Sequence, residues 1–153
     1  MGIALLLHAL AAVVWVGGMF FAYMALRPVA ASQLQAPQRL ALWAGVFGKF
    51  FPWVFIAIGT LLVTGFWMVF AVYGGFDAVG LYVHLMLWLG ILMILVFLHV
   101  FFAPFKRLKQ AVAVEDWPAG ASKLAQIRVL IAINLALGVC VVAVATGGRY
   151  LLT

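Results

Sequence analysis

Three histidines, His8, His84 and His99, are the residues of this chain best suited to chemistry. All three lie inside long segments that carry no charged residue. An imidazole is costly to place in hydrocarbon, so a histidine in such a segment is a functional candidate whose partner must be found. The single cysteine, Cys140, excludes an internal disulfide and a metal site built from several thiolates. The candidate chemistry is therefore that of imidazole.

The depth of each histidine decides which of them can share a ligand. His8 and His84 each lie about five residues inside the start of an apolar segment, which at 1.5 Å per residue is about 6–9 Å below the same membrane surface. His99 lies about 22 Å deeper than His84 along one helix. We therefore predict that His8 and His84 bind one object and that His99 cannot join them; a second metal site at His99 stays open.

Two imidazoles from different helices at one depth suit the axial ligation of a haem iron held between helices. The chain has no C-x-x-C-H motif, so the haem would be non-covalent, of the b type. Trp15 and Trp88 would supply flat apolar walls below the two histidines. Arg149, near the end of the chain, would pair with a haem propionate or anchor the helix among lipid headgroups.

Copper is the alternative ligand. His8 or His84 could bind Cu(I) together with thioethers of Met19, Met86 or Met93, because soft ligands suit this ion. The histidines could instead only hydrogen-bond a neighbouring carbonyl or hydroxyl group. A scaffold subunit without catalytic function is a further alternative.

The composition of the chain indicates that the segments carrying these residues lie in a lipid bilayer. Of the 153 residues, 69% are hydrophobic and only 8% are charged, too few to cover a water-soluble surface. Each of four uncharged runs reaches the ~20 residues that a helix needs to cross a bilayer. We predict an all-α integral membrane protein, a four-transmembrane-helix antiparallel bundle forming one domain over residues 1–153. The predicted spans are about 3–26, 50–73, 79–105 and 126–148.

The distribution of charge predicts the orientation. The formal net charge is +6, and all but one of the nine cations lie between the first and second uncharged runs or between the third and fourth. These cations are Arg27, Arg39, Lys49, Lys106, Arg107, Lys109, Lys123 and Arg128. The positive-inside rule then places the two longer loops in the cytoplasm and both termini in the periplasm of a bacterial inner membrane. The predicted partner is the lipid bilayer and not a nucleic acid; a quinone, a redox partner and a homo-oligomer stay open.

Local signals predict where the helices end. The first helix should end at Arg27-Pro28 and be followed by a polar loop over residues 29–37. Residues 39–51 form either an extension of the second helix, with Pro52 as a kink, or a separate interfacial helix. The third helix should persist to about residue 114, and the fourth should begin near Pro118 with Asp116 as its N-cap.

Periodicity predicts one functional face on the first helix. The residues that share this face are His8, Ala11, Ala12, Trp15, Met19 and Ala22. The Gly17-Gly18 pair would allow close approach of another helix. In the second span, the hydroxyls of Thr60 and Thr64 could bond their own backbone or a neighbouring helix.

The pattern His8-x6-Trp15-x-Gly17-Gly18, with the Arg27-Pro28 exit and a third span carrying His84, resembles the CopD-like (copper-resistance D) membrane family. This resemblance covers the whole chain in the number and order of spans, and its specific motif lies in the first span. It implies copper uptake or handling.

The same first-span pattern also resembles the HemJ-type protoporphyrinogen IX oxidases, which are small four-span proteins with a b-type haem. In that family a lysine follows the third-span histidine by two positions, whereas this chain has Met86 after His84. The expected function is therefore a b-type haem membrane protein in electron transfer or haem-linked oxidation. Copper handling and a protoporphyrinogen-oxidase-like oxidoreductase are the alternatives.

Overall fold

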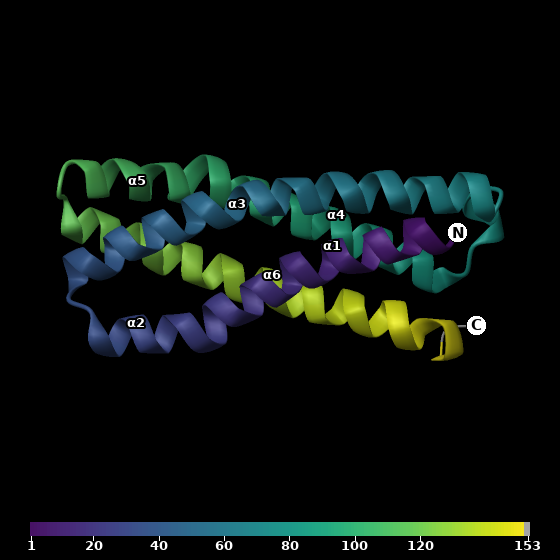
Figure 1. Cartoon of the computed structure of the whole chain (residues 1–153), viewed down its shortest axis with the longest axis horizontal. Coiled ribbons are helices and arrows are strands. Elements are labelled where there is room, and N and C mark those ends of the chain that lie inside the picture. The colour runs from purple at the N-terminus through teal and green to yellow at the C-terminus, as the bar shows by residue number, and fades with distance from the viewer. Residues whose placement is uncertain (152–153) are drawn as a thin grey trace.

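The computed structural model describes residues 1–151, except for the side chains of residues 149 and 151, and in that range the chain is helical with short connections (Figure 1). The first helical segment comprises α1 (Gly2–Phe21), the π-helical η1 (Ala22–Leu26) and α2 (Arg27–Gln33). The second comprises α3 (Ala36–Trp67) and the π-helical η2 (Met68–Val72), and the 3-10 turn η3 (Phe76–Ala78) follows. The third comprises α4 (Leu81–Val100), the π-helical η4 (Phe101–Phe105) and α5 (Lys106–Ala113), and the fourth is α6 (Trp117–Leu151). The predicted all-α, four-helix architecture is confirmed.

Each of these segments is long and apolar enough to cross a membrane. Within the described residues the four candidate spans contain 32, 37, 33 and 32 residues. A bilayer core forces this architecture, because backbone groups in hydrocarbon must bond within their own helix. Since ~20 residues suffice to cross the hydrocarbon, each segment also extends beyond it. The chain is a multi-pass membrane protein.

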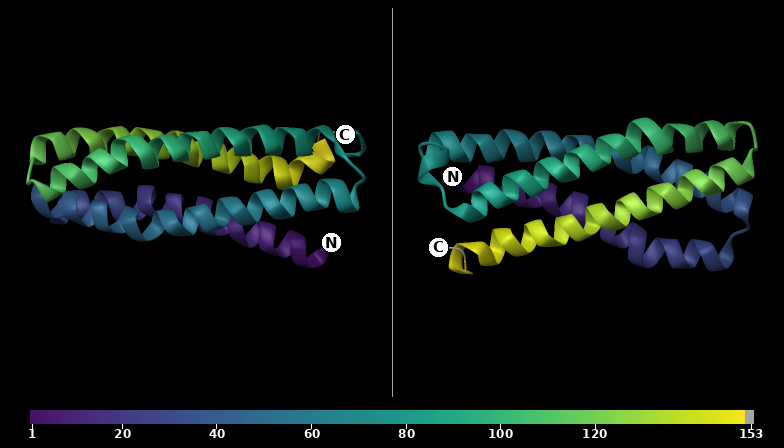
Figure 2. Two further views of the ribbon diagram at one scale, coloured as in Figure 1. Left: turned by 90° about the horizontal axis from the view of Figure 1, so that it is seen from above. Right: turned by 180° about the vertical axis from the view of Figure 1, so that it is seen from behind.

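The bundle is elongated, with distinct ends (Figures 1 and 2). α1 packs chiefly along α3, and α4 packs chiefly along α6. The N-terminus, the α3–α4 connection and the end of α6 lie at one end. The α2–α3 and α5–α6 connections lie at the other end. The eight cations other than Arg149 lie on α2, α3, α5 and α6, the helices that meet there, so we call it the basic end.

The interior is held by aromatic rings and by small residues that let helices approach. Phe51 of α3 packs edge-to-face on Phe97 of α4 at 5.3 Å between centroids. Gly18 lies directly against the ring of Phe50, where any side chain at position 18 would collide. Van der Waals packing of this kind drives association in lipid, where burial of apolar surface contributes little. The prediction that Gly18 permits close approach is confirmed, whereas Gly17 faces open space.

The predicted end of the first helix at Arg27-Pro28 is wrong. The helix continues to Gln33, and only Leu34 and Gln35 separate it from α3, so residues 29–37 are not a loop. The π-helical turn explains the difference: the Arg27 N–H donates to the Ala22 carbonyl, five residues earlier. Proline disrupts a regular helix by lacking an N–H and by crowding an earlier carbonyl. The widened turn before Pro28 accommodates both effects.

The second and third segments settle the other local alternatives. α3 runs through Pro52 without interruption, so residues 39–51 extend the second helix and do not form a separate interfacial helix. The third segment stays helical to Ala113, as predicted. The Asp116 carboxylate accepts a hydrogen bond of 3.1 Å from the Ala119 N–H, which confirms the N-cap.

We expect Asp116→Ala to lower the free energy of unfolding by about 1 kcal/mol, because the first turn of α6 then loses its side-chain acceptor. Thermal unfolding of the purified protein in neutral detergent measures the change. Asp116→Ser is the matched control, since serine caps a helix about as well as aspartate. Equal melting temperatures for the alanine and serine variants would contradict a capping role.

Candidate functional site

His8 is held between α1 and α3 by a hydrogen bond within the membrane-spanning part of the bundle. Its Nδ1 lies 2.9 Å from Oγ1 of Thr64. The ring is half-buried, and its Cε1 would lie only 3.3 Å from a Cβ at Gly65. A larger residue at position 65 would crowd the ring. The partner of His8 is therefore a hydroxyl on the neighbouring helix.

The hydroxyl of Thr64 determines which nitrogen of His8 is protonated. Thr64 Oγ1 donates its one proton to the Thr60 carbonyl at 2.6 Å. Its lone pairs then accept, so His8 Nδ1 must be the donor in the bond between the two side chains. The Nε2 of His8 consequently carries the free lone pair, the form in which a neutral imidazole binds a metal. Of the two alternatives for the threonine hydroxyls, Thr64 satisfies both: it bonds its own backbone and a neighbouring helix.

His84 lies at the same end of the bundle, in the first turn of α4 (Figure 1). Its Nδ1 donates to the Gly80 carbonyl at 3.3 Å, and its ring lies 5.9 Å from that of Phe76. The ring is half-buried. In the described residues, His8 contacts α3 while His84 contacts the start of its own helix. A ligand shared by the two rings stays a prediction.

His99, Trp88 and Trp15 take no part in the hydrogen bonds of His8 and His84. His99 is exposed near the end of α4. Trp88 is 67% exposed, whereas the face of α4 that packs against the core carries Met93 and Phe97; its role as an apolar wall stays a prediction. Trp15 is 3% exposed and packs edge-to-face on Phe97. The side chain of Arg149 lies outside the described residues.

Soft sulfur ligands occur along the interior. Met19 and Met93 are 4% and 3% exposed, and Met86 is half-buried. Sequence reasoning missed Met68, which is half-buried, begins η2 and follows Thr64 by one helical turn. Helical spacing from a polar residue in a span is the signal that would have found it.

A cavity of about 160 Å³ lies deeper in the bundle, against the same face of α1 that carries His8. Trp15, Met19 and Asn134 are among its lining residues. Asn134 is 4% exposed, and its Oδ1 has no hydrogen-bond partner among the residues that the structure describes. The cavity thus presents a thioether and an amide in otherwise apolar surroundings.

In the described part of the chain, no three His, Cys, Asp or Glu side chains lie close enough together to hold a metal ion. The side chains at this end that can bind a metal include the imidazoles of His8 and His84 and the thioethers of Met68 and Met86. Few, soft ligands are the set that Cu(I) accepts.

Comparison with protein families identifies the chain. The family model for copper resistance protein D (CopD) matches residues 44–147, about two thirds of the chain. The chain belongs to the CopD family. No curated protein and no solved structure shows significant similarity to this CopD protein. The match includes His84 and His99, whereas His8 and all of α1 precede it.

Family membership helps to choose between copper and b-type haem as the bound group. It places the chain among membrane proteins linked to copper resistance, which agrees with the copper alternative. Neither the family match nor the described structure gives support to b-type haem.

Proposed function

We propose that this CopD protein handles copper and binds Cu(I) at the end of the bundle opposite the basic end, with His8 as the central ligand. The observation that carries the proposal is the hydrogen bond between His8 Nδ1 and Thr64 Oγ1. A metal-binding histidine almost always donates its other N–H to an acceptor, which sets the tautomer and orients the ring. Thr64, itself held by Thr60, supplies that acceptor.

Thioethers are the proposed companions of His8. Met68 is the first residue of η2 and lies one turn after Thr64, on the side nearer the α3–α4 connection. His84 lies at the same end with its Nδ1 bound, so its Nε2 is also available as a ligand. Imidazole nitrogen and thioether sulfur suit Cu(I) and lack the oxygen donors that harder ions prefer.

The buried methionines extend the proposal toward the bundle interior. Met19 follows His8 by three turns on one face of α1, about 16 Å along the axis, so one ion cannot contact both. Met19 instead lines the deeper cavity, together with the Asn134 amide. We propose that this cavity is a second station for copper as it moves along the bundle.

The direction of handling follows from orientation. We propose that the basic end faces the cytoplasm of a bacterial inner membrane, because positively charged loops stay on that side. His8 then faces the periplasm, where it would take up copper.

Copper binding by the purified full-length chain tests the function. The protein, in neutral detergent with a reductant, is titrated with Cu(I) against a chromophoric chelator of known affinity, and its absorption spectrum is recorded. We expect saturable Cu(I) binding and no Soret band. A red protein with a Soret band that sharpens on dithionite reduction, and without bound copper, would contradict copper handling and restore the haem alternative.

A further inference from the structure

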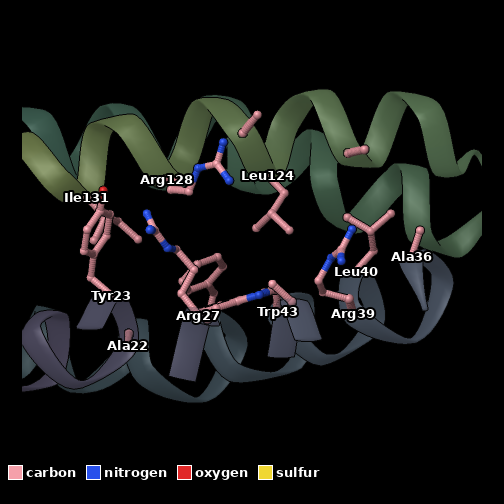
Figure 3. A pocket seen from close by; sticks show the side chains of 14 residues that line it. Ala22, Tyr23, Arg27, Ala36, Arg39, Leu40, Trp43, Leu124, Arg128 and Ile131 are labelled. Carbon is pink, nitrogen blue, oxygen red and sulfur yellow. The ribbon is translucent and has the colours of Figure 1, made fainter. Parts of the chain in front are cut away.

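A second site lies at the basic end, far from His8. A cavity of about 340 Å³ opens between η1, α2 and α3 on one side and α6 on the other. Three arginines line it: Arg27, Arg39 and Arg128. Figure 3 shows Arg128 extending from α6 and the other two from the opposite wall toward the same space. We call this the three-arginine cavity.

No acidic residue compensates these charges. The chain has three carboxylate side chains, and none of them lines the cavity. Asp77 lies at the opposite end, while Glu115 and Asp116 belong to the α5–α6 connection. Three guanidinium groups around one space repel one another, and burial strengthens that repulsion. Arg27 and Arg39 are half-buried, so the cavity favours an anionic occupant.

The chemistry of the lining selects the kind of anion. Guanidinium groups present paired N–H donors that match phosphate oxygens bidentately. The rest of the wall is largely apolar, with Leu40, Phe47 and Ile131 among its residues. An amphiphile with a phosphate head and an apolar body satisfies both parts of the wall.

The aromatic residues of the cavity place it at the headgroup level of the bilayer. Tyr23 and Trp43 line it, and tyrosine and tryptophan gather where hydrocarbon meets headgroups. The guanidinium of Arg27 lies 4.2 Å from the centre of the Tyr23 ring, which holds this cation beside the cavity. Basic pockets between spanning helices at this depth bind anionic lipid headgroups.

We propose that the three-arginine cavity binds the phosphate headgroup of an anionic phospholipid from the adjacent leaflet. α2 contributes Arg27 and Ala31 to one wall and α6 forms the other, so a bound lipid would bridge the two elements. α2 lies apart from the other helices at the basic end (Figure 1). Lipid binding would thereby stabilise the position of α2 relative to α6.

Melting temperatures of the purified full-length chain in neutral detergent test this proposal. Short-chain phosphatidylglycerol is titrated in, with phosphatidylcholine and inorganic phosphate as separate arms. We expect a saturable rise in melting temperature with phosphatidylglycerol alone. The cavity variant R27Q/R39Q/R128Q should need about 100-fold more of this lipid, since each arginine near a lipid phosphate contributes about fivefold.

A matched control separates the cavity from general charge. The variant K106Q/R107Q/K109Q removes three cations from α5, at the same end but outside the cavity. It should keep the half-saturation concentration of the unmodified chain. Equal weakening in both triple variants would overturn the proposal, as would the absence of any lipid effect on the unmodified chain. An equal response to inorganic phosphate would assign the site to a free anion and overturn the lipid.

A single substitution keeps the test decisive if the triple cavity variant does not fold. Arg128 is exposed on α6, so Arg128→Gln disturbs the packing least. It should weaken phosphatidylglycerol binding about fivefold. Lys123→Gln, another cation on α6 that does not line the cavity, serves as its control and should leave binding unchanged.

Discussion

His8→Ala is expected to weaken Cu(I) binding by more than about 100-fold, because it removes the proposed central ligand itself; losing only a hydrogen-bond partner of a metal-binding histidine already costs about 10- to 100-fold. The Cu(I) titration against a chelator measures the loss directly. Helix α1 tolerates alanine well, and the His8 ring is only half-buried, so the variant should remain folded.

Two further variants determine whether the loss reflects ligation. His99→Ala removes an exposed imidazole from the last turn of α4 and should leave the affinity for Cu(I) unchanged. Thr64→Val keeps the shape of the side chain but removes the acceptor for His8 Nδ1, and should weaken binding by about 10- to 100-fold. Unchanged affinity in both His8→Ala and Thr64→Val would exclude the proposed site.

Gly18→Val is expected to lower the free energy of unfolding by about 1–3 kcal/mol, the usual cost of overpacking a filled interior. A Cβ at position 18 would collide with the Phe50 ring, so the ring must shift or α1 and α3 must move apart. Thermal unfolding in neutral detergent, with loss of helical circular dichroism, measures the effect.

The neighbouring glycine is a closely matched control. A Cβ at Gly17 would meet no neighbouring atom within 4 Å, so Gly17→Val should be close to neutral, with the same change in helix propensity. In the double variant Gly18→Val with Phe50→Ala, the added side chain fills the space left by the ring, and part of the stability should return. Similar melting temperatures for the valine variants at 17 and 18 would rule out a close contact at Gly18.

Much of the fold could be predicted because the bilayer leaves few alternatives. An uncharged run of sufficient length must be a helix in hydrocarbon, and a fixed rise per residue then gives each side chain a depth. The buried face of α1, with Trp15 and Met19, also follows from helical periodicity. The path through Pro28 could not be predicted, because a π-helical turn depends on how the helix packs against its neighbours.

The sequence by itself determined the four helices and the basic end, because length and charge are properties of each segment alone; the common level of His8 and His84 follows from helical rise and stays a prediction. Only the tertiary structure decided that His8 faces Thr64 on α3, since helix rotation and the choice of neighbours arise from packing between segments. The same packing brings Arg27 and Arg128 to one cavity although about a hundred residues of chain separate them. The depth of a residue along its helix can be predicted from one segment, whereas the direction in which its side chain points depends on how all the helices pack.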